Sequence, residues 1–223
     1  MRKTNTINVF YKQSLPHILP IGATFFVTFR LNNTLPQVYM RKISDELEAK
    51  IFEIRTSHFL DPEAEIYKQQ KIFFKKFDAA LDKVYDGIDY LKNDEVAQII
   101  ADRMHKYDGK YYDLLAYCIM PNHVHLVIDT SVQVQGLKKD EINAENYKQL
   151  DVIMQLIKGG SSFEINKVLN QTGKFWQLES YDHYARSVEE LSRIIWYVVN
   201  NPVKAKLVKE WTDFPFTYCG WSL

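Results

Sequence analysis

The stretch YCIMPNHVHLVI, Tyr117 to Ile128, places two histidines inside a run that otherwise has the composition of a buried β-strand. Side chains at positions i and i+2 of a strand point to the same face, with their Cα atoms ~6.5–7 Å apart. His123 and His125 therefore share one face, while Val124 and Leu126 point into a core on the other. This spacing predicts two imidazoles that converge on one ligand.

The ligand predicted for this pair is a metal ion or a phosphate. Two histidines that are each satisfied by neighbouring hydrogen bonds are the alternative, but the paired spacing favours a binding site. Zinc is not favoured, because neither Cys118 nor Cys219 lies in a CxxC motif and the sequence contains no HExxH motif. Two imidazoles with an oxygen ligand and open positions suit Mg²⁺ or Mn²⁺ acting on a phosphate.

The segments around the histidines predict an α+β fold. GATFFVTFRL, Gly22 to Leu31, alternates between two faces and is rich in β-branched and aromatic residues, which indicates a strand. A second strand, YYDLLAYCIM, leads into the histidine stretch. Helical patterns follow at 38–106, at 150–169 with an interruption near Gly159-Gly160, and at 188–199 after a Ser187/Glu190 capping box. Strands and helices without regular βαβ alternation are typical of a domain with an antiparallel sheet.

Length, charge and composition limit the class of protein. We expect one domain over residues 1–223, with a helical insertion at 45–106 and a loop or insertion at 130–146. The formal net charge is zero, which argues against a purely non-specific nucleic-acid binder, although the segment 1–44 contains basic residues and no acidic ones. The two cysteines do not make a disulfide framework, and no apolar run predicts a membrane span or a signal peptide. These features predict a cytoplasmic protein that does not insert into a membrane.

Several motifs resemble those of a known family. MPNHVHLVI resembles the His-hydrophobic-His (HUH) motif of single-tyrosine transposases. GATFFVTFRL, FWQLESYDHYAR (Phe175 to Arg186), YVVNNPVKAKL (Tyr197 to Leu207) and WTDFPFTYCGW extend the resemblance to the REP-associated tyrosine transposase (RAYT) group. The resemblance covers nearly the whole chain and is weakest at 45–105 and 130–146. It implies a ferredoxin-like antiparallel sheet with helices packed on one face and the HUH motif on a central strand.

The resemblance also implies roles for residues near the end of the last long helix. Tyr197 matches the nucleophile of these enzymes, which lies on a helix beside the two-histidine strand. Asn201, four residues later, matches the position that supplies a third, oxygen-bearing metal ligand. Because Asn201 precedes Pro202, its conformation can depart from the helix, and His183 or Glu179 remains an alternative ligand.

The residues alone do not identify the nucleophile. The chain has 14 tyrosines, and Tyr181 and Tyr184 also lie near the segments that resemble the family. The spacing of residues does not choose among these tyrosines. The resemblance selects Tyr197.

The activity implied is nicking and joining of single-stranded DNA through a 5′-phosphotyrosine intermediate. The cofactor would be Mg²⁺ or Mn²⁺, the partner single-stranded or hairpin-forming repeat DNA, and the active form a monomer or a homodimer. Basic residues and exposed aromatic residues are what a protein needs to hold a single strand. The candidates for DNA binding are Arg30, Lys158, Lys174 and Arg186.

Two other functions remain open at this point. A domesticated relative would bind specific DNA without strand-transfer activity, although both histidines and the tyrosine are present. A histidine-triad enzyme acting on nucleotides would carry a third alternating histidine, and Val127 stands at that position.

Overall fold

The structure is a computed structural model that describes residues 7, 10–12, 16–83 and 88–221. Part of the basic segment 1–44 lies outside these residues. The chain divides into two compact units, one formed by Met1–Asn32 with Asp89–Leu223 and the other by Asn33–Ile88. The first unit contains the sheet and both histidines, and the second contains a pair of helices.

The first unit is built on a five-stranded antiparallel sheet with the strand order β6-β3-β5-β4-β7. Its strands are β3 (Thr24–Arg30), β4 (Asp113–Ile119), β5 (His123–Asp129), β6 (Tyr181–Tyr184) and β7 (Thr217–Cys219). The histidine strand β5 is therefore the middle strand, which confirms the predicted antiparallel sheet with the HUH motif at its centre. A separate two-stranded ribbon joins β1 (Phe10–Lys12) to β2 (Pro16–Ile18).

Two helices complete a ferredoxin-like repeat on one face of this sheet. The repeat runs β3-α3-β4-β5-α4-β6, with α3 (Asp94–His105) and α4 (Leu150–Val168) packed together. Arg103 of α3 forms an ion pair with Glu164 of α4. The Trp176 indole lies 4.9 Å from the Phe29 ring of β3 and donates a hydrogen bond to Ser161 of α4. The helices of the repeat thus lie on one face, as predicted.

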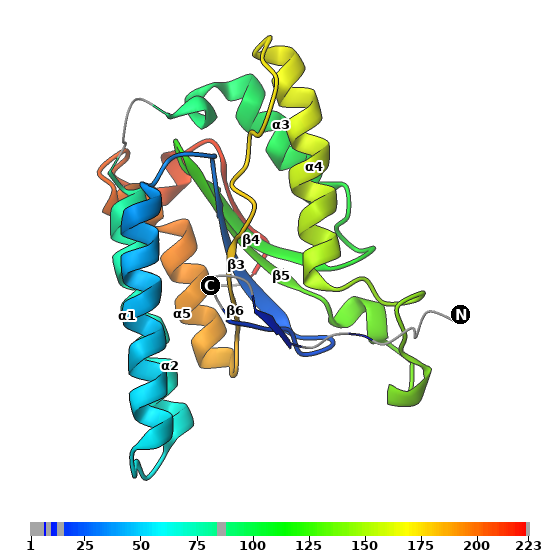
Figure 1. The fold of residues 1–223 in the computed structure, drawn as a ribbon. Coiled ribbons are helices and arrows are strands. Elements are labelled where there is room, and N and C mark those ends of the chain that lie inside the picture. The colour runs from blue at the N-terminus through cyan, green and yellow to red at the C-terminus, as the bar shows by residue number, and fades with distance from the viewer. Residues whose placement is uncertain (1–6, 8–9, 13–15, 84–87, 222–223) are drawn as a thin grey trace. The chain divides into compact units, whose positions relative to one another are not determined.

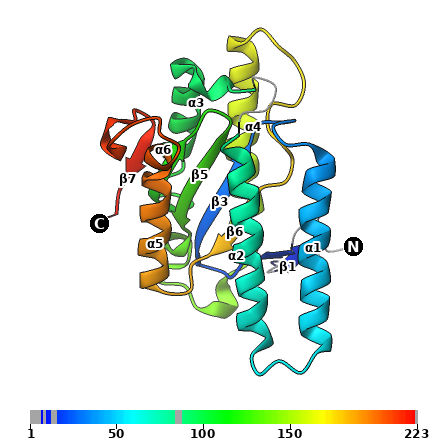
Figure 2. The same cartoon turned by 90° about the vertical axis from the view of Figure 1, so that its left-hand side faces the viewer.

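The opposite face of the sheet is covered by α5 (Val188–Val199), which lies outside the repeat (Figures 1 and 2). Its start follows the predicted capping box, because the Ser187 hydroxyl accepts a hydrogen bond from the Glu190 N–H. The strand period of two sends Phe29 toward α4 and Thr28 toward α5. His125 pairs with Thr28 across the β3–β5 ladder, so the histidine pair lies on the same face as Thr28, which is the face that α5 covers.

Helix α4 is continuous through Gly159-Gly160, so the predicted interruption is wrong. Each glycine costs a helix about 1 kcal/mol relative to alanine, and the buried apolar side of α4 outweighs that cost. Gly160 also has a packing role, because a Cβ atom there would come within 2.6 Å of the Arg103 guanidinium. Gly160 therefore marks a close approach of α3 to α4.

The second unit is an antiparallel helical hairpin of α1 (Gln37–Thr56) and α2 (Pro62–Leu81). Asp61 caps α2 by accepting a hydrogen bond from the Ala64 N–H, and Pro62 stands in the first turn, where its missing N–H costs nothing. The helical segment predicted at 45–106 thus divides between the two units, because α3 packs in the first.

The remaining elements of the first unit are short. Residues 130–146 contain only the 3-10 turns η2 (Ser131–Val134) and η3 (Lys139–Glu141). At the start of this segment, the Thr130 hydroxyl donates a hydrogen bond to the Ala23 carbonyl. The other short helices are η1 (Tyr90–Lys92), α6 (Asn201–Lys204) and η4 (Trp211–Asp213). Among the described residues, no helix has the length and apolar character needed to span a bilayer.

Candidate metal centre and active site

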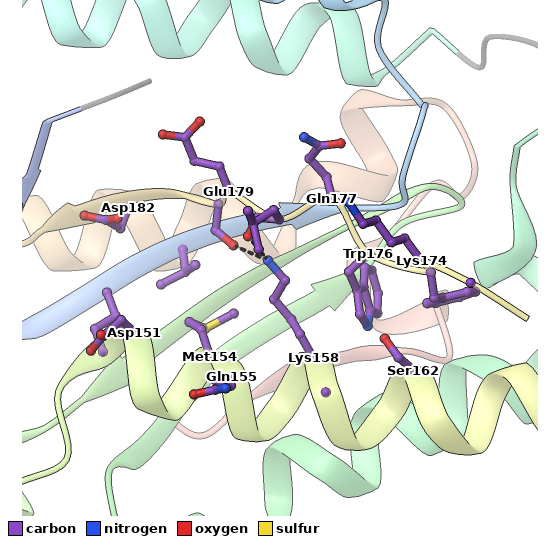
Figure 3. Close-up of a pocket in the computed structure, with 17 residues that line it drawn as sticks. Asp151, Met154, Gln155, Lys158, Ser162, Lys174, Trp176, Gln177, Glu179 and Asp182 are labelled. Carbon is purple, nitrogen blue, oxygen red and sulfur yellow. Dashed lines mark hydrogen bonds between the residues drawn. The ribbon is translucent and has the colours of Figure 1, made fainter. Parts of the chain in front are cut away.

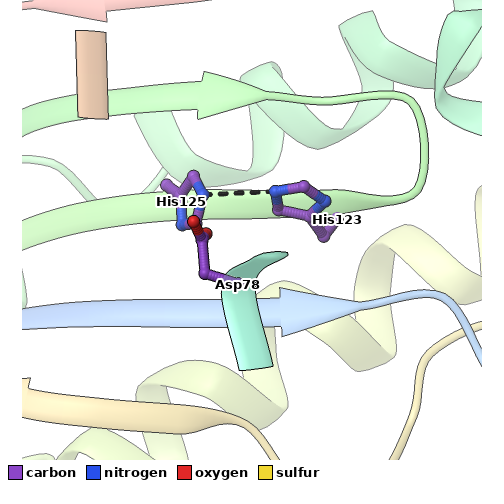
Figure 4. Close-up of side chains that lie close together, drawn as sticks. All are labelled: Asp78, His123 and His125. Carbon is purple, nitrogen blue, oxygen red and sulfur yellow. Dashed lines mark hydrogen bonds between the residues drawn. The ribbon is translucent and has the colours of Figure 1, made fainter. Parts of the chain in front are cut away.

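The two histidines of β5 point toward one another on the face that α5 covers (Figure 4). His123 and His125 are 1% and 0% exposed, and their Nε2 atoms lie 3.2 Å apart. Two ligand atoms that each lie about 2.1 Å from a divalent ion, at a right angle to one another, are about 3.0 Å apart. The separation of the two nitrogens therefore fits a shared metal ion.

The second nitrogen of each ring is held by a neighbouring oxygen. Asn122 Oδ1 lies 2.6 Å from Nδ1 of His123, and Thr28 Oγ1 lies 2.8 Å from Nδ1 of His125. Metal-binding histidines commonly donate their other N–H in this way, which fixes the ring and leaves the opposite lone pair for the metal. An amide oxygen can only accept a hydrogen bond, so the bond to Asn122 places a proton on Nδ1 of His123.

Asn201 offers a buried side-chain oxygen that has no hydrogen-bond partner in the described part of the chain. It is the first residue of α6 and is fully buried. Neither Oδ1 nor Nδ2 has a hydrogen-bond partner among the described residues. A buried amide left in this state costs about 1–3 kcal/mol, and such groups in native proteins commonly face an ion or a ligand. Two imidazoles and one amide oxygen are a donor set that fits Mg²⁺ or Mn²⁺.

The break in the helix before Asn201 follows from Pro202. Helix α5 ends at Val199, and α6 begins two residues later, because proline cannot donate the hydrogen bond that would continue the helix. Helical hydrogen bonding resumes at Asn201, because the Ala205 N–H bonds to the Asn201 carbonyl. Asn201 thus follows Tyr197 by four residues, across the break.

Among the three candidate tyrosines, Tyr197 contacts a histidine of the pair on β5. Its ring centroid lies 5.5 Å from that of His125 and 6.0 Å from that of Phe26. Tyr181 lies on the same face but two strands away from β5, beyond Phe26, and burial raises the pKa of its phenol. Tyr184 pairs with Phe25, and the strand period places it on the other face. The geometry therefore separates three tyrosines that the sequence could not.

The two alternative third ligands have partners elsewhere. His183 Nε2 lies 3.1 Å from a carboxylate oxygen of Glu190, in the first turn of α5. Glu179 interacts with Arg30. The pKa of the Arg30 guanidinium is lowered to about 10, because the effect of burial outweighs the opposing effect of the Glu179 charge. Neither interaction involves the histidine pair.

The four candidate DNA-binding residues are not brought to one place. Arg30 pairs directly with His123 in the sheet and is 6% exposed. Lys158 and Lys174 line a pocket between α4 and the segment before β6. Arg186 is exposed, with its guanidinium 5.2 Å from the Tyr184 ring. Only Arg30 lies beside the histidines.

Sequence reasoning missed Thr28 and Asn122. Thr28 lies in the alternating stretch Gly22 to Leu31, but its bond to His125 depends on the β3–β5 register, which joins residues 97 positions apart. Asn122 directly precedes the first histidine in the stretch Tyr117 to Ile128. Its position next to His123 could have suggested a hydrogen bond to the ring.

Replacing Asn201 by leucine is expected to stabilise the metal-free protein and weaken metal binding. The change removes a buried amide without partners, which should raise the free energy of unfolding by about 1 kcal/mol, and it removes a ligand, which should weaken Mn²⁺ binding at least about tenfold. Urea unfolding and calorimetric titration measure the two effects. The control is Thr130→Val, which breaks a satisfied buried hydrogen bond and should destabilise by about 1 kcal/mol. Equal destabilisation by both changes would contradict the assigned role of Asn201.

Replacing Asn122 by leucine is expected to change the tautomer of His123 and to weaken Mn²⁺ binding about 10–100-fold. Imidazole ¹⁵N NMR of the metal-free protein measures the tautomer, and Asn122→Asp, which keeps an acceptor oxygen, should restore the Nδ1–H form. Thr28→Val should leave His123 unchanged, because its hydroxyl contacts the other ring. An Nδ1–H tautomer of His123 that persists in Asn122→Leu would refute this positioning role.

Comparisons with known proteins find a likeness to solved structures. No protein-family model matches the chain, and no curated protein matches it. A solved structure described as "Structure of the REP associates tyrosine transposase bound to a REP hairpin" is similar over 93% of this chain and 80% of that chain. The two sequences are 16% identical, and the TM-score is 0.44.

Proposed function

We propose that this protein nicks and joins single-stranded DNA in a metal-dependent reaction, with Tyr197 as the nucleophile. The observation that carries the proposal is the tyrosine ring 5.5 Å from His125, whose Nε2 lies 3.2 Å from that of His123. A tyrosine beside a two-histidine metal centre suits attack on a phosphodiester, because phosphate oxygens bind divalent ions and the phenol can attack phosphorus.

The proposed ligands of the metal are His123, His125 and Asn201. The chemistry that Mg²⁺ or Mn²⁺ supplies at such a site is polarisation of the scissile phosphate and stabilisation of the leaving oxygen. Asn122 and Thr28 hold the rings so that both Nε2 atoms face the ion. An unperturbed tyrosine has a pKa of about 10, so its attack at neutral pH needs this assistance.

Tyr197 would form a covalent link with the DNA. A bond forms between the phenolic oxygen and phosphorus while the bond from phosphorus to the 3′ oxygen breaks. The phenolic proton passes to water, and the leaving oxygen takes up a proton to become a 3′ hydroxyl. The 5′-phosphotyrosine link conserves the energy of the phosphodiester, so joining is the reverse of nicking and needs no ATP.

Arg30 is the proposed phosphate-binding residue at this site. It pairs with His123 across the β3–β5 ladder and lies on the same face of the sheet. Although burial lowers the pKa of its guanidinium to about 10, the group stays charged at neutral pH. A cation beside the metal ligands can hold a non-bridging phosphate oxygen.

The experiment that tests this function uses single-stranded hairpin DNA from the flanks of the protein's own gene, labelled at either the 3′ or the 5′ end. With Mg²⁺ or Mn²⁺, the 3′-labelled strand should become attached to the protein in a form that survives denaturation. The 5′-labelled strand should give a shorter, free fragment. Chelation of the metal should abolish both products. Hairpin binding without either product would instead support a DNA-binding protein without strand-transfer activity.

A further inference from the structure

A second site lies on the face of the sheet opposite the histidines. An open pocket of about 480 Å³ runs between α4 and the extended segment 173–182 (Figure 3). This volume lies within the range of small-molecule sites. The pocket has an apolar floor that includes Val27, Met154 and Trp176.

The two aspartates and Lys174 lie at opposite ends of this pocket, with Lys158 and Glu179 between them (Figure 3). Helix α4 and the segment 173–182 run in opposite directions, because Lys158 bonds to Ser180 and Ser161 bonds to Trp176. Asp151 and Asp182 therefore lie toward one end, and Lys174 lies at the other (Figure 3). Asp151 precedes Lys158 by seven residues, which is about 10 Å along a helix.

Lys158 lies between these ends, and its ammonium group makes two hydrogen bonds to neighbouring oxygens. Its ammonium group donates to the Leu178 carbonyl at 2.7 Å and to the Ser180 hydroxyl at 3.1 Å. An ammonium group has three N–H bonds, and two of those of Lys158 have acceptors among the described residues, so the third can bind a ligand. The pKa of Lys158 is lowered to about 8, mainly by burial and in part by the positive charge of Arg30, while the Glu179 charge opposes the shift. A desolvated ammonium of this kind gains more from an anionic ligand than a fully hydrated one.

Two glycines keep the lysine end of the pocket open. Gly159 on α4 and Gly173 beside Lys174 line the pocket, and a Cβ atom at either position would meet no atom within 4 Å. Gly159 has helical backbone angles that any residue can adopt, so the fold does not require glycine there. The open space lies next to the two lysines.

We infer that this pocket binds one unpaired nucleotide of a DNA strand, with its phosphate at the lysine end and a base carrying an exocyclic amino group at the carboxylate end. The inference rests on the proposed function for the nature of the partner. Lysine binds phosphate as a point charge, and carboxylates accept hydrogen bonds from amino groups such as N4 of cytosine. The apolar floor suits the faces of a base. Thymine, which has no exocyclic amino group, fits the carboxylate end poorly.

The test measures binding of short fluorescent oligo(dC), oligo(dA) and oligo(dT) by anisotropy in the presence of a chelator, so that no cleavage takes place. Oligo(dC) and oligo(dA) should bind about tenfold more tightly than oligo(dT). Lys158→Met should weaken binding of all three and reduce the slope of log K against log salt by about 0.7. Asp151→Asn should instead reduce the preference over oligo(dT).

Matched changes outside the pocket serve as controls. Lys167→Met removes another lysine of α4, and Asp140→Asn removes another aspartate of the first unit. Both should leave oligonucleotide binding unchanged. Gly159→Leu adds a side chain at an exposed helical position and should block the pocket while the protein remains folded by circular dichroism.

The outcomes separate this inference from the proposed function. Equal binding of all three oligonucleotides, or equal affinities for wild type and Gly159→Leu, would overturn the inference and leave metal-dependent cleavage at Tyr197 unaffected. Selective oligonucleotide binding that Gly159→Leu abolishes would support the pocket even if no covalent adduct formed. Loss of binding in the control variants as well would also overturn it.

Discussion

Replacing Tyr197 by phenylalanine is expected to abolish the covalent protein–DNA adduct while DNA binding and the fold are retained. The change removes only the phenolic oxygen, which is the atom that forms the bond to phosphorus. The ring that contacts His125 and Phe26 remains. The rate of adduct formation should fall by at least about 10⁴-fold, the scale on which loss of a catalytic nucleophile acts. Denaturing gels with 3′-labelled DNA measure the adduct, and anisotropy measures binding.

The matched controls for this change are Tyr181→Phe and Tyr184→Phe. Tyr181 lies beyond Phe26, and Tyr184 lies on the other face of the sheet, so each variant should form the adduct at close to the wild-type rate. An adduct that survives in Tyr197→Phe and disappears in either of these variants would move the nucleophile to β6.

Replacing either histidine of the pair by asparagine is expected to remove metal binding and cleavage together. Each ring supplies one Nε2 atom to a pair that lies 3.2 Å apart, and one imidazole does not hold the ion in place. Loss of the metal removes several kcal/mol of transition-state stabilisation, so cleavage should fall by at least about 10³-fold. Calorimetric titration with Mn²⁺ should show no binding in the concentration range used for wild type.

The control for the histidine changes is His105→Asn. His105 is exposed at the end of α3 and contacts Tyr117 and Tyr218 rather than the pair on β5. Its replacement should leave Mn²⁺ binding and cleavage unchanged. Full cleavage by His123→Asn or His125→Asn would contradict a metal centre on β5.

The sequence predicted β3, β4, β5, α4 and α5 because the signals of these elements are local. The alternation of Gly22 to Leu31 indicated β3, and Ser187 with Glu190 indicated the start of α5. The same local reading failed at Gly159-Gly160, where the apolar side of α4 and the close approach of Arg103 decide the conformation. Propensity is weak evidence where tertiary packing opposes it.

The site was less predictable because it depends on pairing between distant segments. The i, i+2 spacing was enough to predict that His123 and His125 share a face. The partner of His125 is Thr28, and only the β3–β5 register brings the two together. The register of β6 separates Tyr181 from Tyr184, and the packing of α5 brings Tyr197 to His125. Periodicity within one segment carries no information about such contacts.

The measurement that tests the central claim most directly is tandem mass spectrometry of the protein–DNA adduct after protease and nuclease digestion. The account predicts a nucleotide attached through phosphate to Tyr197, in an adduct that forms only when Mg²⁺ or Mn²⁺ is present. A tyrosine–phosphate link is stable to acid, whereas a histidine–phosphate link is not. A nucleotide attached to His123, His125 or any other tyrosine would contradict the account.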